Sequence, residues 1–593
     1  MYSIEQRDDQ LIGTSAKIRY HLRFGRAAQH LLEVEMEVDT TDNELILVMP
    51  SWTPGSYKIR EFVAHQGNLV VNSINGDTLQ YEWKSKNILS IHNPSKSTVT
   101  ISYTYYANER TVRTMHINRW RAFIMPVNCL MYVQNRMNEI HHVYLHHNKE
   151  EWSTVSTALS PVVNDTNTSI VGALNYDVLA DSPIEIGNHQ VAMFEYCGAK
   201  HEVALIAPLP LDIEWLTEQC KIIVQTEASI FGGLPYDRYV FMVQVGMNVY
   251  GGLEHSRCSV NLVDIGQMTD RNKSGTLLAL LCHEFFHTWN IKRIRPVEFG
   301  TFDYVNECYS PMLWLAEGFT SYYDDLLSYR CGFMSRNEYI STLGADHIAK
   351  LERVPGRLAM NTRDASYLAW VKLYAQSPDG NNRHPSYYLK GGIITLMIEL
   401  YIIAQSNGTK RLDDAMRELW KMYIERPYQG VTEQEVFNAI LISTGVDVTE
   451  LLSGMLHGTD DIDYNVYFEP LGLQWQKQSS EFFKPRVFTG MNTKDDGGKV
   501  IITSVEDNTP AANAGLSIDD EILSVNNLRV TTNGGLVELL NRNNTNPAQI
   551  LASCDGKVFL AEVTPIEKTE SRLVIKSDIT DAQQSLLDFW LNR

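Results

Sequence analysis

The sequence has few cysteines for its length, and none of them is in a disulfide or metal-binding arrangement. Eight cysteines are spread over 593 residues, with no C-x-x-C pair. Disulfide frameworks and cysteine-ligated zinc sites need closely and regularly spaced cysteines. We therefore expect reduced thiols, most of them buried, and no metal site built from cysteine.

The chain also lacks an excess of positive charge. It carries 51 Lys and Arg residues against 71 Asp and Glu residues, which gives a formal net charge of -20. A nucleic-acid-binding protein needs a basic surface that releases counterions from phosphates. The charge balance therefore argues against a nucleic-acid partner.

Long hydrophobic runs are absent as well. The most apolar stretch, 391–404, is too short to span a membrane and contains Glu399, so it predicts a buried helix and no membrane partner. The first 20 residues contain no apolar segment of the kind found in signal peptides. We expect a cytoplasmic location, and a periplasmic one remains open for a chain whose signal peptide has been removed.

The length and the changing sequence pattern predict a multidomain α+β protein. A chain of 593 residues exceeds what one hydrophobic core supports. Short alternating strands fill an N-terminal antiparallel β domain, 1–174, and longer helical segments dominate an α+β domain, 175–464. Short strands with one main helix return in a small β domain, 465–568. A partly helical tail, 569–593, follows.

The segment HEFFH, at 283–287, carries the strongest chemical signal. His283 and His287 are four residues apart, so on a helix both imidazoles lie on one face and reach the same metal ion. Glu284 then lies where it can contact a water molecule beside that ion. The apolar residues before it and Pro296 after it predict a buried helix that extends to about residue 295.

A catalytic zinc ion usually has three protein ligands, and the sequence offers a third in Glu317. Ser310 and Pro311 begin a predicted helix that ends at Gly332, and Glu317 lies at the edge of its apolar stripe. The alternative is a solvent-exposed glutamate. Asp324, two turns later, can accept a hydrogen bond from a ligand imidazole, or it can be a solvated acidic residue.

Three cations follow the metal-binding segment. Lys292, Arg293 and Arg295 lie where the end of the predicted helix exposes its carbonyl groups, so we interpret them as partners of the helix dipole. The other interpretation, a role in binding a substrate carboxylate, is the weaker of the two. These residues are therefore left out of the predicted site.

Together these segments resemble the glycyl aminopeptidases, gluzincin metallopeptidases that are related to aminopeptidase N and carry a C-terminal PDZ domain. The resemblance covers most of the chain and rests on six segments. They are PSWTPGSYKIREF (50–62), YDVLADSPIEIG (176–187), YGGLEH (250–255), HEFFHTWNIKRIRP (283–296), WLAEGFTSYY (314–323) and TPAANAGLSIDDEILSVNN (509–527). It implies a thermolysin-like catalytic domain at 175–464 and a PDZ-like domain at 465–568.

The resemblance also implies roles for residues outside the zinc motif. The segment Gly251-Gly252-Leu253-Glu254-His255 is similar to the G-x-M-E-N segment of aminopeptidase N, in which the glutamate binds the free amine of the substrate. It differs from that pattern by Leu for Met and His for Asn. Tyr388, in a Y-x-K-G segment, matches a tyrosine that stabilises the oxyanion, and the neighbouring Tyr387 is an alternative.

The predicted function is zinc-dependent peptide hydrolysis, with one Zn²⁺ per chain and peptides or proteins as substrates. The resemblance implies an aminopeptidase that favours small N-terminal residues such as Gly and Ala. Two alternatives remain: a metalloendopeptidase with the same zinc chemistry, and a non-catalytic protein whose PDZ-like groove binds peptide termini.

Overall fold

The computed structural model describes residues 7–163, 170–300, 302–479 and 486–592. The chain forms two compact units. The first consists of Met1–Tyr309, Tyr323–Phe333 and Met416–Val436. The second consists of Ser310–Tyr322, Met334–Ala415 and Phe437–Arg593.

The first unit begins with a domain of β-sheets. Its largest sheet has seven strands in the order β13-β14-β11-β1-β2-β7-β4. The strand β2 (Leu31–Val38) shows why it forms: its apolar residues alternate with glutamates, so one face packs into the core and the other remains polar. The other strands of this sheet are β1 (Ile18–Arg23), β4 (Gln66–Ser73), β7 (Val99–Tyr106), β11 (His141–His146), β13 (Ser160–Pro161) and β14 (Ile170–Ala173).

Two four-stranded sheets complete this β domain. One has the order β10-β3-β6-β5, and the other has the order β12-β15-β9-β8. Their strands are β3 (Glu44–Val48), β5 (Tyr81–Ser85), β6 (Ile88–His92), β8 (His116–Asn118), β9 (Arg121–Ile124), β10 (Tyr132–Val133), β12 (Thr154–Thr157) and β15 (Ile184–Gly187). Between the domain's strands, α2 (Tyr176–Ala180) begins at Asn175, whose side chain accepts a hydrogen bond from the Val178 amide.

A five-stranded mixed sheet follows in the same unit. It carries Glu254, and the helix with His283 and Glu284 packs against it. Its order is β16-β17-β18-β20-β19, with β17, β18 and β20 parallel and β19 antiparallel at the edge. The strands are β16 (Gln190–Tyr196), β17 (Ala199–Ile206), β18 (Arg238–Gly246), β19 (Gly251–Glu254) and β20 (Cys258–Asp264), and the helices α3 (Ile213–Phe231) and α5 (Gly275–Phe286) pack nearby. The edge strand β19 therefore carries one side without a strand partner.

The second unit is mainly helical. Its central helix, α11 (Tyr387–Gln405), is long and apolar enough to cross a membrane by length and composition, and most of it is buried in the protein. This burial agrees with the prediction made from residues 391–404. The helix packs against the π-helical segment η5 (Trp314–Gly318), where Gly318 and Gly391 bring the two backbones into contact.

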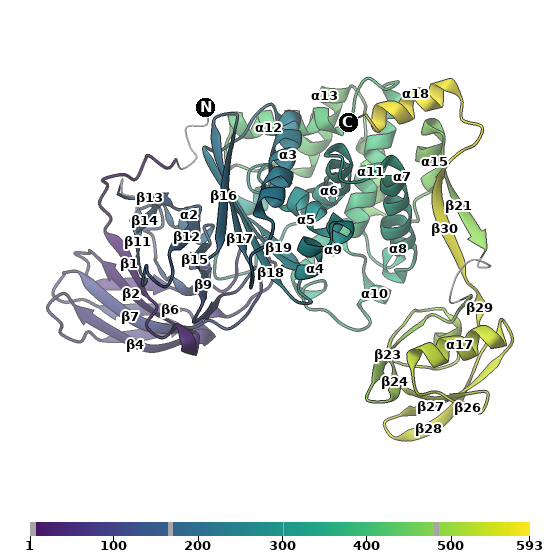
Figure 1. Cartoon of the computed structure of the whole chain (residues 1–593), viewed down its shortest axis with the longest axis horizontal. Helices are drawn as coiled ribbons and strands as arrows, with labels where there is room; N and C mark the ends of the chain where they lie inside the picture. The colour runs from purple at the N-terminus through teal and green to yellow at the C-terminus, as the bar shows by residue number, and fades with distance from the viewer. Residues whose placement is uncertain (1–6, 164–169, 301, 480–485, 593) are drawn as a thin grey trace. The chain divides into compact units, whose positions relative to one another are not determined.

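The end of the chain forms a small β module inserted between two paired strands. The strand β21 (Leu473–Ser479) is antiparallel to β30 (Thr569–Ile575), with Ser479 opposite Thr569. The module between them contains β23 (Met491–Asp496), β24 (Lys499–Val505), β25 (Glu521–Val525), β27 (Ala548–Cys554) and β28 (Lys557–Val563), with α17 (Asn533–Asn543) lying along them (Figure 1). After β30 the chain ends in α18 (Asp581–Trp590).

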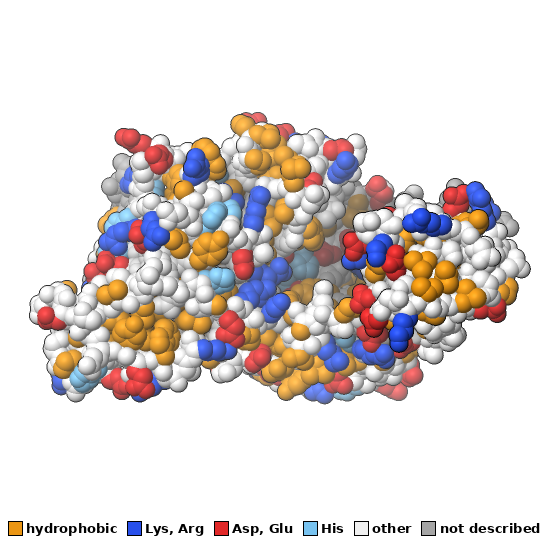
Figure 2. Space-filling view, turned by 90° about the horizontal axis from the view of Figure 1, so that it is seen from below, with side chains coloured by type: hydrophobic (Ala, Val, Ile, Leu, Met, Phe, Trp, Pro, Cys, Tyr) orange, Lys and Arg blue, Asp and Glu red, His pale blue; other side chains and the backbone are white. Residues whose placement is uncertain are grey.

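The surface carries charges of both signs. Figure 2 shows acidic, basic and apolar side chains interspersed over one face, with a group of Lys and Arg side chains near its middle. All eight cysteines are free, and four of them, Cys129, Cys220, Cys258 and Cys282, are buried. The expectation that most of the thiols are buried therefore holds for only half of them, since Cys197 and Cys554 are exposed and Cys308 and Cys331 are partly exposed.

The fold class predicted from the sequence is confirmed: an N-terminal β domain precedes a mainly helical region and a C-terminal β module. The exact domain boundaries stay predictions. One detail was wrong, because α5 ends at Phe286 and does not extend to residue 295. Beyond it, Ile291 has a φ of 106°, a conformation that no helix accommodates. Lys292, Arg293 and Arg295 therefore do not belong to the last turn of a helix.

Candidate metal centre

The end of α5 presents the two histidines. His283 lies in its last turn, and His287 is the residue that caps its C-terminal end. Both rings are held by hydrogen bonds at Nδ1: that of His283 is 3.0 Å from Oδ2 of Asp324, and that of His287 is 2.8 Å from the carbonyl oxygen of Asn290. Histidines that bind a metal ion commonly have their other ring nitrogen hydrogen-bonded in this way.

Glu317 comes from a different element. It lies in η5, directly before α6 (Phe319–Arg330), and is only 2% exposed. Single π-helical turns are rare and are found mostly at functional sites. The prediction that Glu317 is not a solvent-exposed glutamate agrees with this burial.

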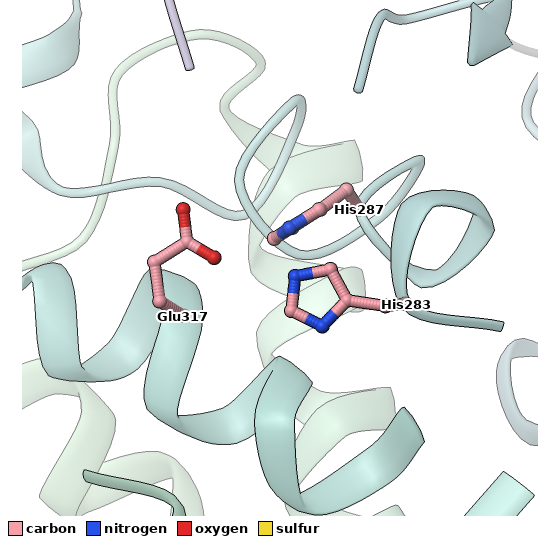
Figure 3. A group of neighbouring side chains, drawn as sticks. All are labelled: His283, His287 and Glu317. Atoms are coloured by element: carbon pink, nitrogen blue, oxygen red, sulfur yellow. The ribbon is translucent and has the colours of Figure 1, made fainter. Parts of the chain in front are cut away.

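The structure brings His283, His287 and Glu317 together (Figure 3). One potential ligand atom of each residue lies within 4.8 Å of the corresponding atoms of the other two. Two imidazoles and one carboxylate at this spacing are a donor set that suits Zn²⁺ and leaves a coordination position open. The three residues therefore fit a catalytic zinc ion.

Glu284 points toward the edge strand of the mixed sheet. It is 4% exposed, and its side chain lies so close to Gly252 of β19 that a methyl group on Gly252 would be 1.7 Å from Oε1. Glycine is needed at this position because any larger residue would displace the carboxylate. The predicted general base is thus held directly against the strand that borders the site.

Glu254, at the end of β19, joins the same group. Ligand atoms of Glu254, Glu284 and His287 all lie within 4.8 Å of one another, and all three residues belong to the first unit. Glu254 is 4% exposed and lies against Gly55, whose φ of 87° favours glycine. The segment PSWTPGSY of the β domain therefore contacts the predicted amine-binding glutamate.

Asp181 fixes the backbone that follows Glu254. Its carboxylate accepts hydrogen bonds from Nδ1 of His255 at 3.0 Å and from the amide of Ser256 at 2.8 Å, and it pairs with Nζ of Lys292 at 2.7 Å. Burial alone would raise the pKa of Asp181, but Lys292 and His255 outweigh that effect and hold it well below its ordinary value. Asp181 is therefore ionised at neutral pH.

The two tyrosines considered for stabilising the oxyanion, Tyr387 and Tyr388, are adjacent in the second unit. The hydroxyl of Tyr388 is 3.1 Å from that of Tyr374, while Tyr387 is completely buried. Burial and the nearby carboxylate of Glu317 raise the pKa of Tyr388 well above its ordinary value, so its hydroxyl keeps its proton. The hydroxyl of Tyr388 is thus close enough to the carboxylate of Glu317 to interact with it.

Several residues that border the site were not predicted. Asp181 and Gly55 act through contacts between distant segments, and Nη2 of Arg113 donates a hydrogen bond to the carbonyl of Gly252 at 3.3 Å. Gly55 and Asp181 lie in segments that carry the family resemblance, and this was the sequence signal available for them.

Comparison with protein families identifies three regions. The Peptidase M61 N-terminal domain matches residues 19–188, the M61 glycyl aminopeptidase family matches residues 276–394, and the PDZ domain matches residues 471–549. The resemblance found in the sequence is thereby confirmed. No curated protein sequence matches the chain.

Comparison with solved structures gives matches to peptidases. An aminopeptidase N family protein from Idiomarina loihiensis is 28% identical with a TM-score of 0.90, covering 97% of this chain and 100% of that one. An aminopeptidase A from Legionella pneumophila, in complex with aspartic acid, is 15% identical with a TM-score of 0.46, over 96% and 57% of the two chains. An M1 zinc metallopeptidase from Deinococcus radiodurans is 12% identical with a TM-score of 0.46, over 77% and 99%.

Proposed function

We propose that the chain, a metallopeptidase that matches the M61 glycyl aminopeptidase family over residues 276–394, is a zinc aminopeptidase that removes small N-terminal residues such as glycine and alanine from peptides. The observation that carries the proposal is the grouping of Glu254, Glu284 and His287 beside the edge strand β19. The preference for small residues rests on the family resemblance.

His283, His287 and Glu317 would hold the metal, as their donor types and mutual distances support. A bound Zn²⁺ supplies Lewis acidity, which lowers the pKa of water toward about 7 and polarises the scissile carbonyl group. Asp324 and Asn290 keep the two imidazoles in the tautomer and orientation that this ligation needs.

Glu284 is the general base in this proposal. Its carboxylate takes a proton from the attacking water and later delivers it to the nitrogen of the leaving amine. The contact with Gly252 fixes where that carboxylate lies. Tyr388, whose hydroxyl keeps its proton, donates a hydrogen bond to the developing oxyanion, a contribution usually worth about 3 kcal/mol.

Glu254 would bind the α-ammonium group of the substrate. Glu254 and Glu284 are two buried carboxylates close to each other, and like charges in such a place destabilise one another. Among the described residues, Glu254 forms no ion pair with Lys or Arg. A substrate ammonium beside Glu254 supplies a compensating positive charge.

The substrate backbone would lie along β19. This strand has one side without a strand partner, and an extended peptide can pair with such an edge. Its glycines, Gly251 and Gly252, allow a close approach of another backbone. The PDZ-like module would bind peptide termini separately, and we propose a cytoplasmic location for the enzyme.

The competing activity is that of a metalloendopeptidase with the same zinc chemistry. In that case Glu254 would contact the substrate backbone instead of a free amine. An extended peptide along β19 suits both activities, so the amine is the feature that distinguishes them.

The test compares matched peptides with free and acetylated N-termini, with and without a chelator. We expect cleavage of the free peptides alone, complete loss with chelator, and about one zinc per chain by elemental analysis. Glu254→Ala should lower kcat/KM for free peptides more than about tenfold, with zinc content unchanged. Equal cleavage of acetylated peptides, slowed equally by Glu254→Ala, would establish the endopeptidase instead.

A further inference from the structure

A cavity of about 330 Å³ lies in the first unit, on residues that the proposed mechanism does not use. This volume is within the range of small-molecule sites. The charged residues on its walls are Asp177, Asp181, Arg257, Lys292 and Arg295. They include three cations and two carboxylates, so the charges decide what the cavity can bind.

Two of the three cations have protein partners. Arg257 pairs with Asp8 at 3.0 Å and with Asp237 at 2.6 Å. Lys292 pairs with Asp181 at 2.7 Å, in the contact that fixes the segment after Glu254. Because these charges are compensated within the protein, they do not require a ligand.

Arg295 is different. Its side chain is only 8% exposed, and its guanidinium lies 5.4 Å from the ring of Phe302 and 5.3 Å from that of Tyr428. Nη2 donates a hydrogen bond to the carbonyl of Gly300 at 3.0 Å. Among the described residues, Nε has no hydrogen-bond acceptor, and no carboxylate forms an ion pair with this arginine. A buried cation without a counter-ion is costly, which favours an anion in the cavity.

Asp177 is a carboxylate on another part of the cavity wall and is opposite in charge to Arg295. Its Oδ1 accepts a hydrogen bond from the hydroxyl of Tyr304 at 2.7 Å. Asp177 and Arg295 both line the cavity, yet they form no ion pair with each other. The cavity thus presents one cation and one anion that are held apart, with the apolar side chains of Leu174, Val178 and Phe302 also on its wall.

We propose that this cavity binds a free α-amino acid with an apolar side chain. The carboxylate would pair with Arg295, the ammonium group with Asp177, and the side chain would contact the apolar wall. A single small zwitterion would compensate both charges, whereas a simple anion would leave Asp177 without a cation. The inference goes beyond the proposed function and does not depend on turnover.

The cavity is close to the proposed amine site without sharing a residue with it. Pro54 lines the cavity, and the next residue, Gly55, lies against Glu254. An amino acid is also what an aminopeptidase releases, so the proposed catalytic site could bind the same probe. The experiment therefore has to remove the proposed amine site first.

The binding of L-leucine is measured by calorimetry in full-length Glu254→Ala protein, beside N-acetyl-leucine and leucinamide. We expect one leucine per chain, and weaker binding of both analogues because each lacks one charge. Arg295→Met should weaken leucine binding by about tenfold or more. The matched control is Arg271→Met, which removes an arginine that stacks on Trp215 at 3.7 Å outside the cavity.

A second variant keeps the proposal testable if Arg295→Met fails to fold. Asp177→Asn should weaken the binding of leucine and leave that of N-acetyl-leucine unchanged. The proposal is wrong if no leucine binds at millimolar concentration in the Glu254→Ala protein. It is equally wrong if leucinamide binds as tightly as leucine, or if folded Arg295→Met protein binds leucine like the control.

Discussion

The backbone of Gly252 lies directly against the carboxylate of Glu284, so closely that a methyl group on Gly252 would be 1.7 Å from Oε1. Gly251, the preceding residue, is in a different position: its nearest neighbours to an added methyl group would be Val112 at 3.6 Å and Arg113 at 3.8 Å. Of these two adjacent glycines, Gly251 has room for an added methyl group and Gly252 does not.

This difference gives the first prediction. Gly252→Ala should displace the Glu284 carboxylate and lower kcat/KM by about a hundredfold, because a misplacement of about 1 Å has that effect on catalytic groups. Gly251→Ala is the control and should retain most of the activity. Zinc content and thermal unfolding are measured for both. Full activity in Gly252→Ala would mean that the position of Glu284 does not matter.

The second prediction concerns Glu284 itself. Glu284→Gln keeps the size of the side chain but cannot accept the proton from water, so turnover should fall about a hundredfold or more. Zinc content should be unchanged because Glu284 is not among the three proposed ligands. Elemental analysis checks this directly, and loss of zinc from the variant would show that a ligand has been assigned incorrectly.

The third prediction concerns the orientation of His283. Asp324→Asn removes the charged acceptor at Nδ1 and should weaken zinc binding by about 10 to 100-fold, as changes next to metal-ligating histidines typically do. Competition with a chelator measures the affinity. Glu214→Gln, on the exposed surface of α3, removes the same charge and should bind zinc like the unmodified protein.

The fourth prediction concerns acid stability. His141 and His201 are completely buried, and burial lowers the pKa of each to about 4, against about 6.5 in an unfolded chain. The unfolded chain therefore binds more protons below pH 6.5, and each histidine should cost about 2 kcal/mol of stability by pH 5. The loss should continue down to about pH 4.

Urea unfolding of the chelated protein at pH 7.5 and pH 5 tests this, because chelation removes any contribution from zinc release. His141→Gln should lose about 2 kcal/mol less than the unmodified protein between the two pH values, whatever its stability at pH 7.5. A pH dependence identical to that of the unmodified protein would contradict the assignment.

The fifth prediction uses the pairing of β21 with β30. Since Ser479 lies opposite Thr569, replacing residues 480–568 by an Asn-Gly turn should join the two strands as a hairpin and leave the rest of the chain folded. We expect unchanged zinc content and cleavage of small peptides. A folded, zinc-containing deletion that cleaves none would show that the module contributes to catalysis.

A simple truncation after Gly458 should behave differently, because it also removes α18. Trp590 in that helix is completely buried, donates a hydrogen bond to the hydroxyl of Tyr322 at 3.2 Å and packs against Tyr339 at a ring distance of 5.7 Å. Losing a buried tryptophan costs about 3 to 5 kcal/mol. Trp590→Ala is the matched point variant and should show this cost by itself.

The sequence predicted the elements whose signal is local. The i, i+4 spacing of His283 and His287 requires a helix, and the buried stripe around Glu317 marked it as a third ligand candidate. The order of β and helical regions followed from the change in hydrophobic periodicity. These patterns are visible because neighbouring residues determine them.

Contacts between distant segments were not predictable in the same way. Asp181 meets His255 and Lys292, and Gly55 meets Glu254, only because the β domain and the mixed sheet fold onto one another. The end of α5 was also misplaced, since Pro296 was taken as the stop although the chain leaves the helix at Phe286. The apolar pattern gave no sign of that earlier end.

The insertion of the PDZ-like module before α18 has a consequence for the order of folding during synthesis. Domains generally fold as units as they leave the ribosome. The helix with Trp590 is synthesised after the whole module, yet Trp590 is buried beside Tyr322, which is synthesised some hundreds of residues earlier. The helical unit therefore lacks the packing of Trp590 until the module has been synthesised. A nascent chain can fold its β module before α18 packs onto the helical unit.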